Sequence, residues 1–225
     1  MDSFPHATYC GTATSTSVPC VLSDLERRDF KVETAAERGN LLDVAAAAGY
    51  RVTWVDNNTG CQGVCARVGQ MDVAPLMTKD ICTSVSCYDE ILVRALKEIA
   101  KTPADHFVVL HMLGSHGPSY YLRYPPEFKK FTPECATSEL SNCSREEIIN
   151  TYDNSVLYTD FILHELIAEL GNLAGSYDTA LIYMSDHGES LGENGIYLHS
   201  LPYFAAPKEQ KEVPFVVWLS KSGSE

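Results

Sequence analysis

The sequence predicts an α/β fold in which helices flank a mostly parallel sheet and disulfides staple the loops. Three observations predict it. Short apolar runs typical of strands alternate with amphipathic stretches typical of helices. Polar clusters follow three of the apolar runs, where the carboxyl ends of parallel strands would meet, and the cysteines lie in sequence-local pairs. With 225 residues, we expect a single domain, residues 1–225, around one core.

The first elements are a short helix and a strand. Residues 40–48 favour a helix with Asn40 as N-cap and Gly49 as its left-handed end. Residues 51–55 are rich in β-branched and aromatic side chains, which predicts a strand. Residues 56–60 are polar and predict a loop after that strand. This loop is the first candidate site.

A second helix and strand follow. Residues 88–100 place their apolar side chains on one helical stripe. Residues 107–110 form a continuous apolar run, which predicts a strand buried on both faces. The turn that follows, residues 111–118, carries His111 and His116, and we expect His116 to be the functional one. His111 fits a structural role as well as a functional one.

The longest helix follows an irregular excursion over residues 119–142. Ser144 and Glu147 have the spacing of a capping box. The side chains expected to face inward from this helix are Ile148, Tyr152, Val156, Ile162, Leu166 and Leu170.

Two strands complete the expected sheet. Residues 179–184 predict a strand that opens into the acidic and imidazole groups of residues 185–189. Residues 213–219 predict a last buried strand.

Charge excludes one class of partner. Lys and Arg total 17 against 30 Asp and Glu, a net charge of −13, so we expect no nucleic-acid binding. No apolar run approaches the ~18 residues of a membrane span, and residues 1–6 do not resemble a signal peptide.

The cysteines predict four local disulfides. Eight cysteines allow 105 connectivities, but their clustering makes short-range pairing the simplest arrangement, and they lack the spacing of a zinc site. The expected pairs are Cys10 with Cys20, Cys61 with Cys65, Cys82 with Cys87, and Cys135 with Cys143. Disulfides indicate an oxidising compartment, so we expect this chain without an export signal to be part of a longer, exported protein.

A metal site is predicted at the end of residues 179–184. A turn at Gly188 would let the adjacent Asp186 and His187 reach one ion, and carboxylate plus imidazole suits Zn²⁺. His199 could fold back over the same site. An isolated Asp-His pair is more often an ordinary polar loop, but the additional histidines at this sheet edge favour a site.

A hydroxyl-rich segment between Cys10 and Cys20 is the second candidate. A Thr or Ser hydroxyl becomes a useful nucleophile when a metal or a base lowers its pKa. Composition alone does not choose among its five hydroxyl residues, and an ordinary Ser/Thr-rich loop is the alternative.

Four motifs together resemble the periplasmic catalytic domain of the phosphoethanolamine transferases that modify lipid A, including the mobile colistin resistance enzymes. They span residues 10–20 (CGTATSTSVPC), 114–135, 150–160 and 185–203. The resemblance covers nearly the whole chain. It implies an alkaline-phosphatase/sulfatase-like fold, zinc and a threonine nucleophile that carries phosphoethanolamine.

By position in these motifs, the resemblance assigns individual roles. Thr14 would be the nucleophile and, with Asp186 and His187, would hold zinc. His116 and His199 would be catalytic. The predicted substrate-binding residues are Thr12, Asn58, Gln62 and Glu189.

Two departures from the family pattern accompany the resemblance. Gln62 stands where family members commonly have lysine, so a neutral amide replaces a cation that could face phosphate. The family's first zinc ligand, a glutamate on a preceding strand, and the membrane helices are absent from this sequence.

The function implied is transfer of phosphoethanolamine from phosphatidylethanolamine to lipid A at the periplasmic face of the bacterial inner membrane, giving polymyxin resistance. We expect a monomer attached to the membrane through the helices that this sequence lacks. Two alternatives remain: a hydrolase of the same superfamily, and an inactive fragment short of one zinc ligand.

Overall fold

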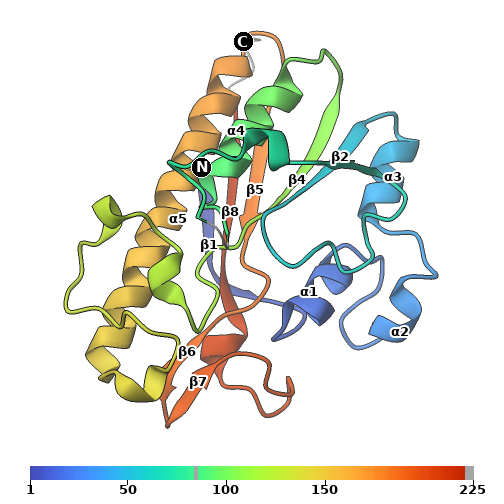
Figure 1. The fold of residues 1–225 in the computed structure, drawn as a ribbon. Coiled ribbons are helices and arrows are strands. Elements are labelled where there is room, and N and C mark those ends of the chain that lie inside the picture. Colours follow the sequence, from blue (N-terminus) through green and yellow to red (C-terminus); the bar gives the residue numbers. More distant parts are fainter. Residues whose placement is uncertain (84–85, 221–225) are drawn as a thin grey trace.

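The computed structural model describes residues 1–83 and 86–220 (Figure 1). Its strands are β1 (Asp2–Thr8), β2 (Arg51–Asp56), β3 (Gly69–Met71), β4 (His106–His111), β5 (Ala180–Met184), β6 (Ser190–Glu193), β7 (Ile196–Leu198) and β8 (Glu212–Leu219). Its α-helices are α1 (Thr14–Val21), α2 (Val32–Ala35), α3 (Leu41–Ala47), α4 (Glu90–Ala100) and α5 (Arg145–Leu173).

The strands form two three-stranded sheets and a hairpin. In the order β1-β8-β5, the central strand β8 runs antiparallel to both neighbours. In the order β3-β2-β4, both pairs are parallel, and β6 pairs with β7 as an antiparallel hairpin. The predicted α/β class is therefore confirmed. Parallel pairing does not dominate, because one described sheet is parallel whereas in the other β8 runs antiparallel to both of its partners.

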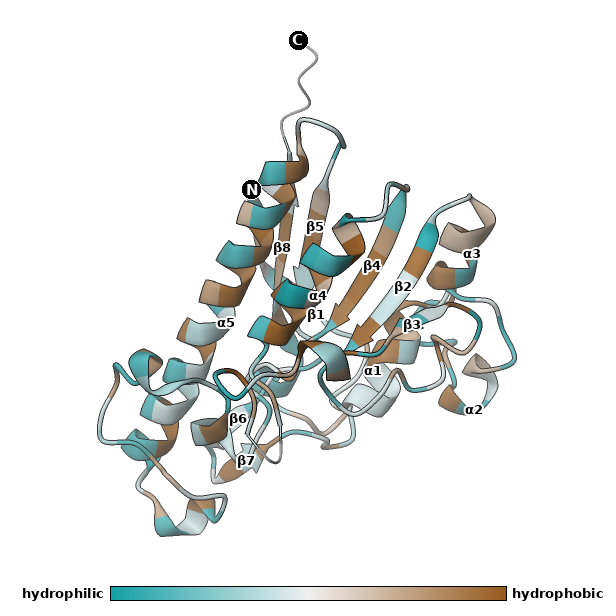
Figure 2. Cartoon of the chain, turned by 45° about the horizontal axis from the view of Figure 1, so that its top comes forward, coloured by the Kyte–Doolittle hydropathy of each residue, from teal (hydrophilic) through white to brown (hydrophobic). Residues whose placement is uncertain are grey.

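Helices α4 and α5 cover one face of these sheets (Figure 2). Leu92 of α4 packs near Val108 and Leu110 of β4. Ile162 of α5 belongs to a cluster against which Leu181 of β5 packs. This packing brings the ends of β4 and β5, and therefore the polar segments that follow them, into one region.

The two predicted helix caps are confirmed. The Asn40 side chain accepts a hydrogen bond from the Leu42 amide at the start of α3, and Gly49 beyond its end has φ of +96°. At the start of α5, the Ser144 hydroxyl accepts from the Glu147 amide. Caps of this kind satisfy amide groups that have no partner within the helix.

The four predicted disulfides are also confirmed. They join Cys10 to Cys20, Cys61 to Cys65, Cys82 to Cys87, and Cys135 to Cys143. Each crosslinks a short stretch of chain.

Several elements differ from the sequence expectation. Much of the hydroxyl-rich segment is helix α1 rather than a loop, because Val18 packs into a core cluster with Leu42 and Trp54. Strand β1 and the β6–β7 hairpin were not predicted. Strand β4 is half-buried throughout rather than buried on both faces, and it forms an edge of its sheet.

Val156 was expected to face inward from α5 but is 44% exposed. At 100° per residue, Val156 lies about 80° around the helix from Ile148, whereas Ser155 lies only about 20° away on the opposite side. Ser155 is buried in its place. The buried stripe therefore includes polar residues that a purely apolar pattern overlooks.

Candidate active site

The turn after β5 holds a buried carboxylate oxygen without a hydrogen-bond partner. Asp186 Oδ2 is buried and unpaired, and lies 3.7 Å from Nε2 of His187. Nδ1 of His187 lies 2.9 Å from the carbonyl oxygen of Gly188, so Nδ1 is the protonated nitrogen and Nε2 is free to accept. A buried carboxylate beside a free imidazole nitrogen fits a cation such as Zn²⁺.

Gly188 is required by the close packing of this turn. A Cβ at this position would lie 2.1 Å from the carbonyl oxygen of Glu209 and 2.9 Å from that of Glu212. The Gly188 amide donates to the carbonyl of Gln210 across the same contact. The turn that carries Asp186 and His187 is therefore held against the start of β8.

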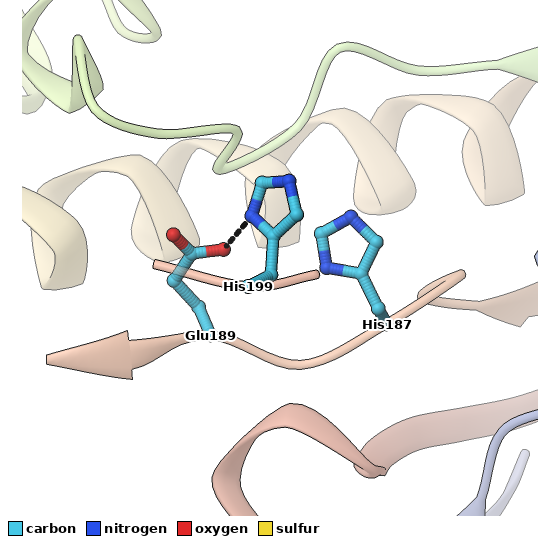
Figure 3. Close-up of side chains that lie close together, drawn as sticks. All are labelled: His187, Glu189 and His199. Carbon is cyan, nitrogen blue, oxygen red and sulfur yellow. Dashed lines mark hydrogen bonds and ion pairs between the residues drawn. The ribbon is translucent and has the colours of Figure 1, made fainter. Parts of the chain in front are cut away.

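His187, Glu189 and His199 form a compact group with ligand atoms within 4.8 Å of one another (Figure 3). The imidazole rings of His187 and His199 stack with centroids 4.0 Å apart. Glu189 Oε2 lies 2.8 Å from Nδ1 of His199, and its other oxygen accepts from the Tyr120 hydroxyl at 2.6 Å. The hairpin β6–β7 brings Glu189 and His199 together because they flank it.

His116 completes the imidazole cluster. Its ring centroid lies 5.1 Å from that of His199 and 6.5 Å from that of His187. Burial lowers the pKa of His116. Burial also opposes protonation of His199, but the hydrogen bond and negative charge of Glu189 outweigh it, so the pKa of His199 is raised. The two histidines are thus biased toward opposite protonation states.

The predicted nucleophile segment approaches this cluster through Thr12. The Ser200 amide donates to the Thr12 carbonyl at 2.8 Å, and the Thr12 hydroxyl donates to the carbonyl of Leu201 at 2.6 Å. Thr14 is the first residue of α1, where the positive end of the helix favours an anion. Tyr9, just before the segment, has its pKa raised by burial and by the negative charge of Asp186.

The contacts of Thr12 and Thr14 bear differently on their predicted roles. The Thr12 hydroxyl is already used to hold the loop after His199. In the described part of the chain, no hydrogen bond or ion pair joins the Thr14 side chain to Asp186 or His187. The metal-ligating roles of these three residues remain predictions.

Asn58 and Gln62 lie on the loop after β2. Asp56, which ends β2, lies 2.7 Å from Nδ1 of His111 and accepts from the amides of Asn58 and Gly60. The Asn58 side chain donates to the Met112 carbonyl, while its oxygen is buried and unpaired. Gln62 donates to the Thr59 carbonyl at 3.3 Å within its own loop. His111 thus organises this loop together with Asp56.

The sequence did not reveal a buried carboxylate that holds the turn leading to His116. Asp89 accepts hydrogen bonds from the amides of Leu113 and Gly114 and from the Asn57 side chain. Arg123 then donates to the carbonyl of His116 at 2.8 Å. Asp89 looked like an ordinary acidic residue at the start of a helix, and no local pattern distinguishes it.

Comparison with known proteins identifies the family. Residues 3–225 match the sulfatase family. The chain is 52% identical over 219 residues to phosphoethanolamine transferase EptA of Salmonella typhimurium and 39% identical over 226 residues to phosphatidylethanolamine transferase Mcr-1 of Escherichia coli. These alignments cover 97% of this chain but only 40% and 42% of the two relatives.

A solved structure agrees. The soluble domain of lipooligosaccharide phosphoethanolamine transferase A from Neisseria meningitidis superposes with a TM-score of 0.93 at 44% identity, over 98% of this chain and 66% of that one. No helix in residues 1–83 and 86–220 has the length and apolarity needed to cross a membrane. The chain belongs to the sulfatase family, and the relatives EptA and Mcr-1, which it matches over part of their length, are phosphoethanolamine transferases.

Proposed function

We propose that this chain carries the catalytic site of a zinc-dependent enzyme that transfers phosphoethanolamine from phosphatidylethanolamine to a phosphate of lipid A. The observation that carries the proposal is the hydrogen bond from the Ser200 amide to the Thr12 carbonyl. It joins the segment that holds Thr14 to the loop that holds His199. This contact supports a site in which the Thr14 hydroxyl would act beside the imidazole cluster.

Asp186 and His187 are the residues that would hold zinc, together with the Thr14 oxygen. The unpaired Asp186 Oδ2 and the free His187 Nε2 support this choice. Bound zinc would lower the pKa of the threonine hydroxyl and offset negative charge on the phosphoryl group. Glu189 and His199 could also be ligands, but Nδ1 of His199 and both carboxylate oxygens of Glu189 are already engaged, the oxygens by His199 and Tyr120. We therefore assign His199 to proton transfer.

In the first step, Thr14 Oγ attacks the phosphorus of phosphatidylethanolamine. A bond between Thr14 Oγ and phosphorus forms, and the bond from phosphorus to the diacylglycerol oxygen breaks. His199, whose pKa is raised, is suited to give a proton to the leaving diacylglycerol oxygen. His116, whose pKa is lowered by burial, is suited to take the proton that Thr14 Oγ loses as it attacks.

In the second step, a phosphate oxygen of lipid A attacks the phosphorus of the phosphoethanolamine group on Thr14. The bond from that oxygen to phosphorus forms and the bond from phosphorus to Thr14 Oγ breaks. The proton held by His116 returns to Thr14 Oγ, and the proton of the attacking phosphate passes to His199. Asn58, Gln62 and Glu189 would contact the ethanolamine or phosphate groups. The product carries an added ammonium group, which reduces the attraction of cationic polymyxins to lipid A. This reaction would take place at the periplasmic face of the inner membrane.

A further strand would complete the site in the full-length protein. Strands β4 and β5 each have one edge without a hydrogen-bonded neighbour among the described residues, and they lie next to each other in both views (Figures 1 and 2). We propose that a strand from outside these 225 residues pairs at these edges and brings the family's glutamate ligand. On this account, the chain alone binds zinc weakly and turns over little substrate.

The experiment compares this chain with the full-length protein. Each is incubated with zinc and phosphatidylethanolamine carrying a fluorescent diacylglycerol group, and the released diacylglycerol and intact protein mass are measured. We expect release and a phosphoethanolamine adduct on Thr14 only in the full-length protein. Equal turnover by this chain would contradict the missing-ligand account, and free phosphoethanolamine as the final product with lipid A present would indicate a hydrolase.

A further inference from the structure

The chain between β7 and β8 forms a loop at one end of the molecule (Figure 1), and this loop carries an exposed aromatic side chain. Phe204 is 92% exposed, the largest fraction among the large apolar side chains of the described residues. Exposed Pro202 and Ala205 flank it. Leaving a phenyl ring in water forfeits the free energy of burying it, so a partner that covers Phe204 would gain that energy.

The loop is braced, so the exposure of Phe204 is a property of a defined conformation. The amides of Ala205 and Ala206 both donate to the Pro202 carbonyl, at 2.8 and 2.9 Å. Gln210 is fully buried at the base of the loop, where its side chain donates to the Leu198 carbonyl and accepts from the Leu201 amide. A braced loop loses little conformational entropy when its tip meets a surface.

Cationic side chains surround the tip. The guanidinium carbon of Arg27 lies 3.3 Å from the ring centroid of Tyr203, and Lys211 Nζ lies 5.3 Å from it. Lys208 is exposed nearby. Throughout residues 1–83 and 86–220, ion pairs involve other basic residues and none of these three. Arg27 Nε donates a hydrogen bond to the Cys10 carbonyl, so among the described residues none of the three cations is neutralised by a carboxylate, in a chain with a net charge of −13.

An aromatic tip with a basic surround is the combination that binds anionic membrane interfaces, where the ring enters the headgroup boundary and the cations face lipid phosphates. A protein partner would need a complementary apolar surface as well as acidic groups. The bilayer supplies both over a wide area.

The loop is also joined to the candidate active site. It begins directly after His199, and its Ser200 and Leu201 hydrogen-bond to Thr12. A surface that receives Phe204 would therefore lie a few residues along the chain from the imidazole cluster. For a reaction that takes one lipid as donor and another as acceptor, this holds the site at the lipid headgroups.

We propose that the loop of residues 200–207 docks this domain on an anionic phospholipid bilayer, with Phe204 entering the interface and Arg27, Lys208 and Lys211 facing lipid phosphates. The catalytic meaning of this contact rests on the proposed function. The contact itself can be tested without any turnover.

The test measures sedimentation of this chain with vesicles of phosphatidylethanolamine and phosphatidylglycerol. Phe204→Ser should lower the partition coefficient about tenfold, in line with losing most of one buried aromatic side chain. The matched control is Val156→Ser, which removes an exposed apolar group from α5 and should leave binding unchanged. Circular dichroism checks that both variants keep their helices.

A second set of variants tests the contribution of the cationic side chains. Lys208→Ala and Lys211→Ala should each lower binding about fivefold on these vesicles, with no such loss on pure phosphatidylcholine. Equal binding by the parent chain and Phe204→Ser would overturn the proposal. So would a dimer that Phe204→Ser dissociates without any vesicle binding, because Phe204 would then serve an interface between copies.

Vesicle binding by this chain and phosphoethanolamine transfer by the full-length protein are measured separately, so that the two proposals can fail independently. Vesicle binding that depends on Phe204, with no phosphoethanolamine transfer by the full-length protein, would retain the docking surface and reject the transferase mechanism. If the full-length protein transfers phosphoethanolamine but vesicle binding does not depend on Phe204, the transferase mechanism is retained and the docking surface is rejected.

Discussion

Glu189 lies between two partners, with one carboxylate oxygen 2.8 Å from Nδ1 of His199 and the other accepting a hydrogen bond from Tyr120. Burial lowers the pKa of His199, but the hydrogen bond to Glu189 and the negative charge of Glu189 outweigh burial and raise it. The pair therefore keeps a proton on His199 to higher pH than an ordinary histidine would.

Glu189→Gln should lower the pKa of His199, because the amide retains a hydrogen-bond acceptor but not the charge. In zinc-free protein, the His199 proton should then be lost at lower pH than in the parent chain. Titration of the imidazole resonances by NMR measures this directly. Glu209→Gln is the control, and an unchanged His199 midpoint in Glu189→Gln would show that Glu189 does not set its protonation.

Thr14→Ala in the full-length protein should abolish diacylglycerol release, because the atom that attacks phosphorus is removed. Thr16→Ala, two residues along α1, should keep much of the activity. Initial rates with fluorescent phosphatidylethanolamine give both values. If the two variants lose activity equally, the segment matters for its structure and Thr14 is not the nucleophile.

Gly188→Ala should lower the free energy of unfolding by about 3 kcal/mol, because the backbone atoms that the added Cβ would meet cannot move away easily. The added Cβ would meet the Glu209 carbonyl oxygen at 2.1 Å. Gly171→Ala in α5 is the matched control: its Cβ meets nothing within 4 Å, and alanine favours a helix by roughly 0.5–1 kcal/mol.

Thermal unfolding followed by circular dichroism separates the two substitutions. The midpoint should fall for Gly188→Ala and stay level or rise for Gly171→Ala. Equal midpoints would mean that the turn after β5 can move away from Glu209, and that the positions of Asp186 and His187 are less constrained than the contacts indicate.

The sequence predicted those features whose cause is local. The Ser144 and Glu147 capping box and the Asn40 cap need only residues three or fewer positions apart. The disulfides likewise join cysteines that are close along the chain. For such features, the sequence contains both interacting groups in one short window.

Features that depend on distant contacts escaped prediction. Helix α1 contains Pro19 and several β-branched or hydroxyl residues, which individually disfavour a helix. Tertiary packing of Val18 with Leu42 outweighs this preference. Asn154 is buried in α5 because its side chain holds the backbone of Lys130 and Phe131, and no periodic pattern reveals such a role.

In the candidate site, too, some features were predictable from the sequence and others were not. The motif positions of His116, His187 and His199 predicted that these residues act together, and their rings form one cluster. The contacts that hold the turn around His116 were not predictable. Asp89 at the start of α4 accepts from the amides of Leu113 and Gly114, and Arg123 from the excursion donates to the His116 carbonyl.

Mass spectrometry of lipid A tests the central claim most directly. Bacteria that lack other lipid A modifications would express the full-length protein or its Thr14→Ala variant at matched levels. Our account predicts lipid A with added phosphoethanolamine for the parent protein and unmodified lipid A for Thr14→Ala. Unmodified lipid A from cells that contain the folded, zinc-loaded parent protein would contradict it.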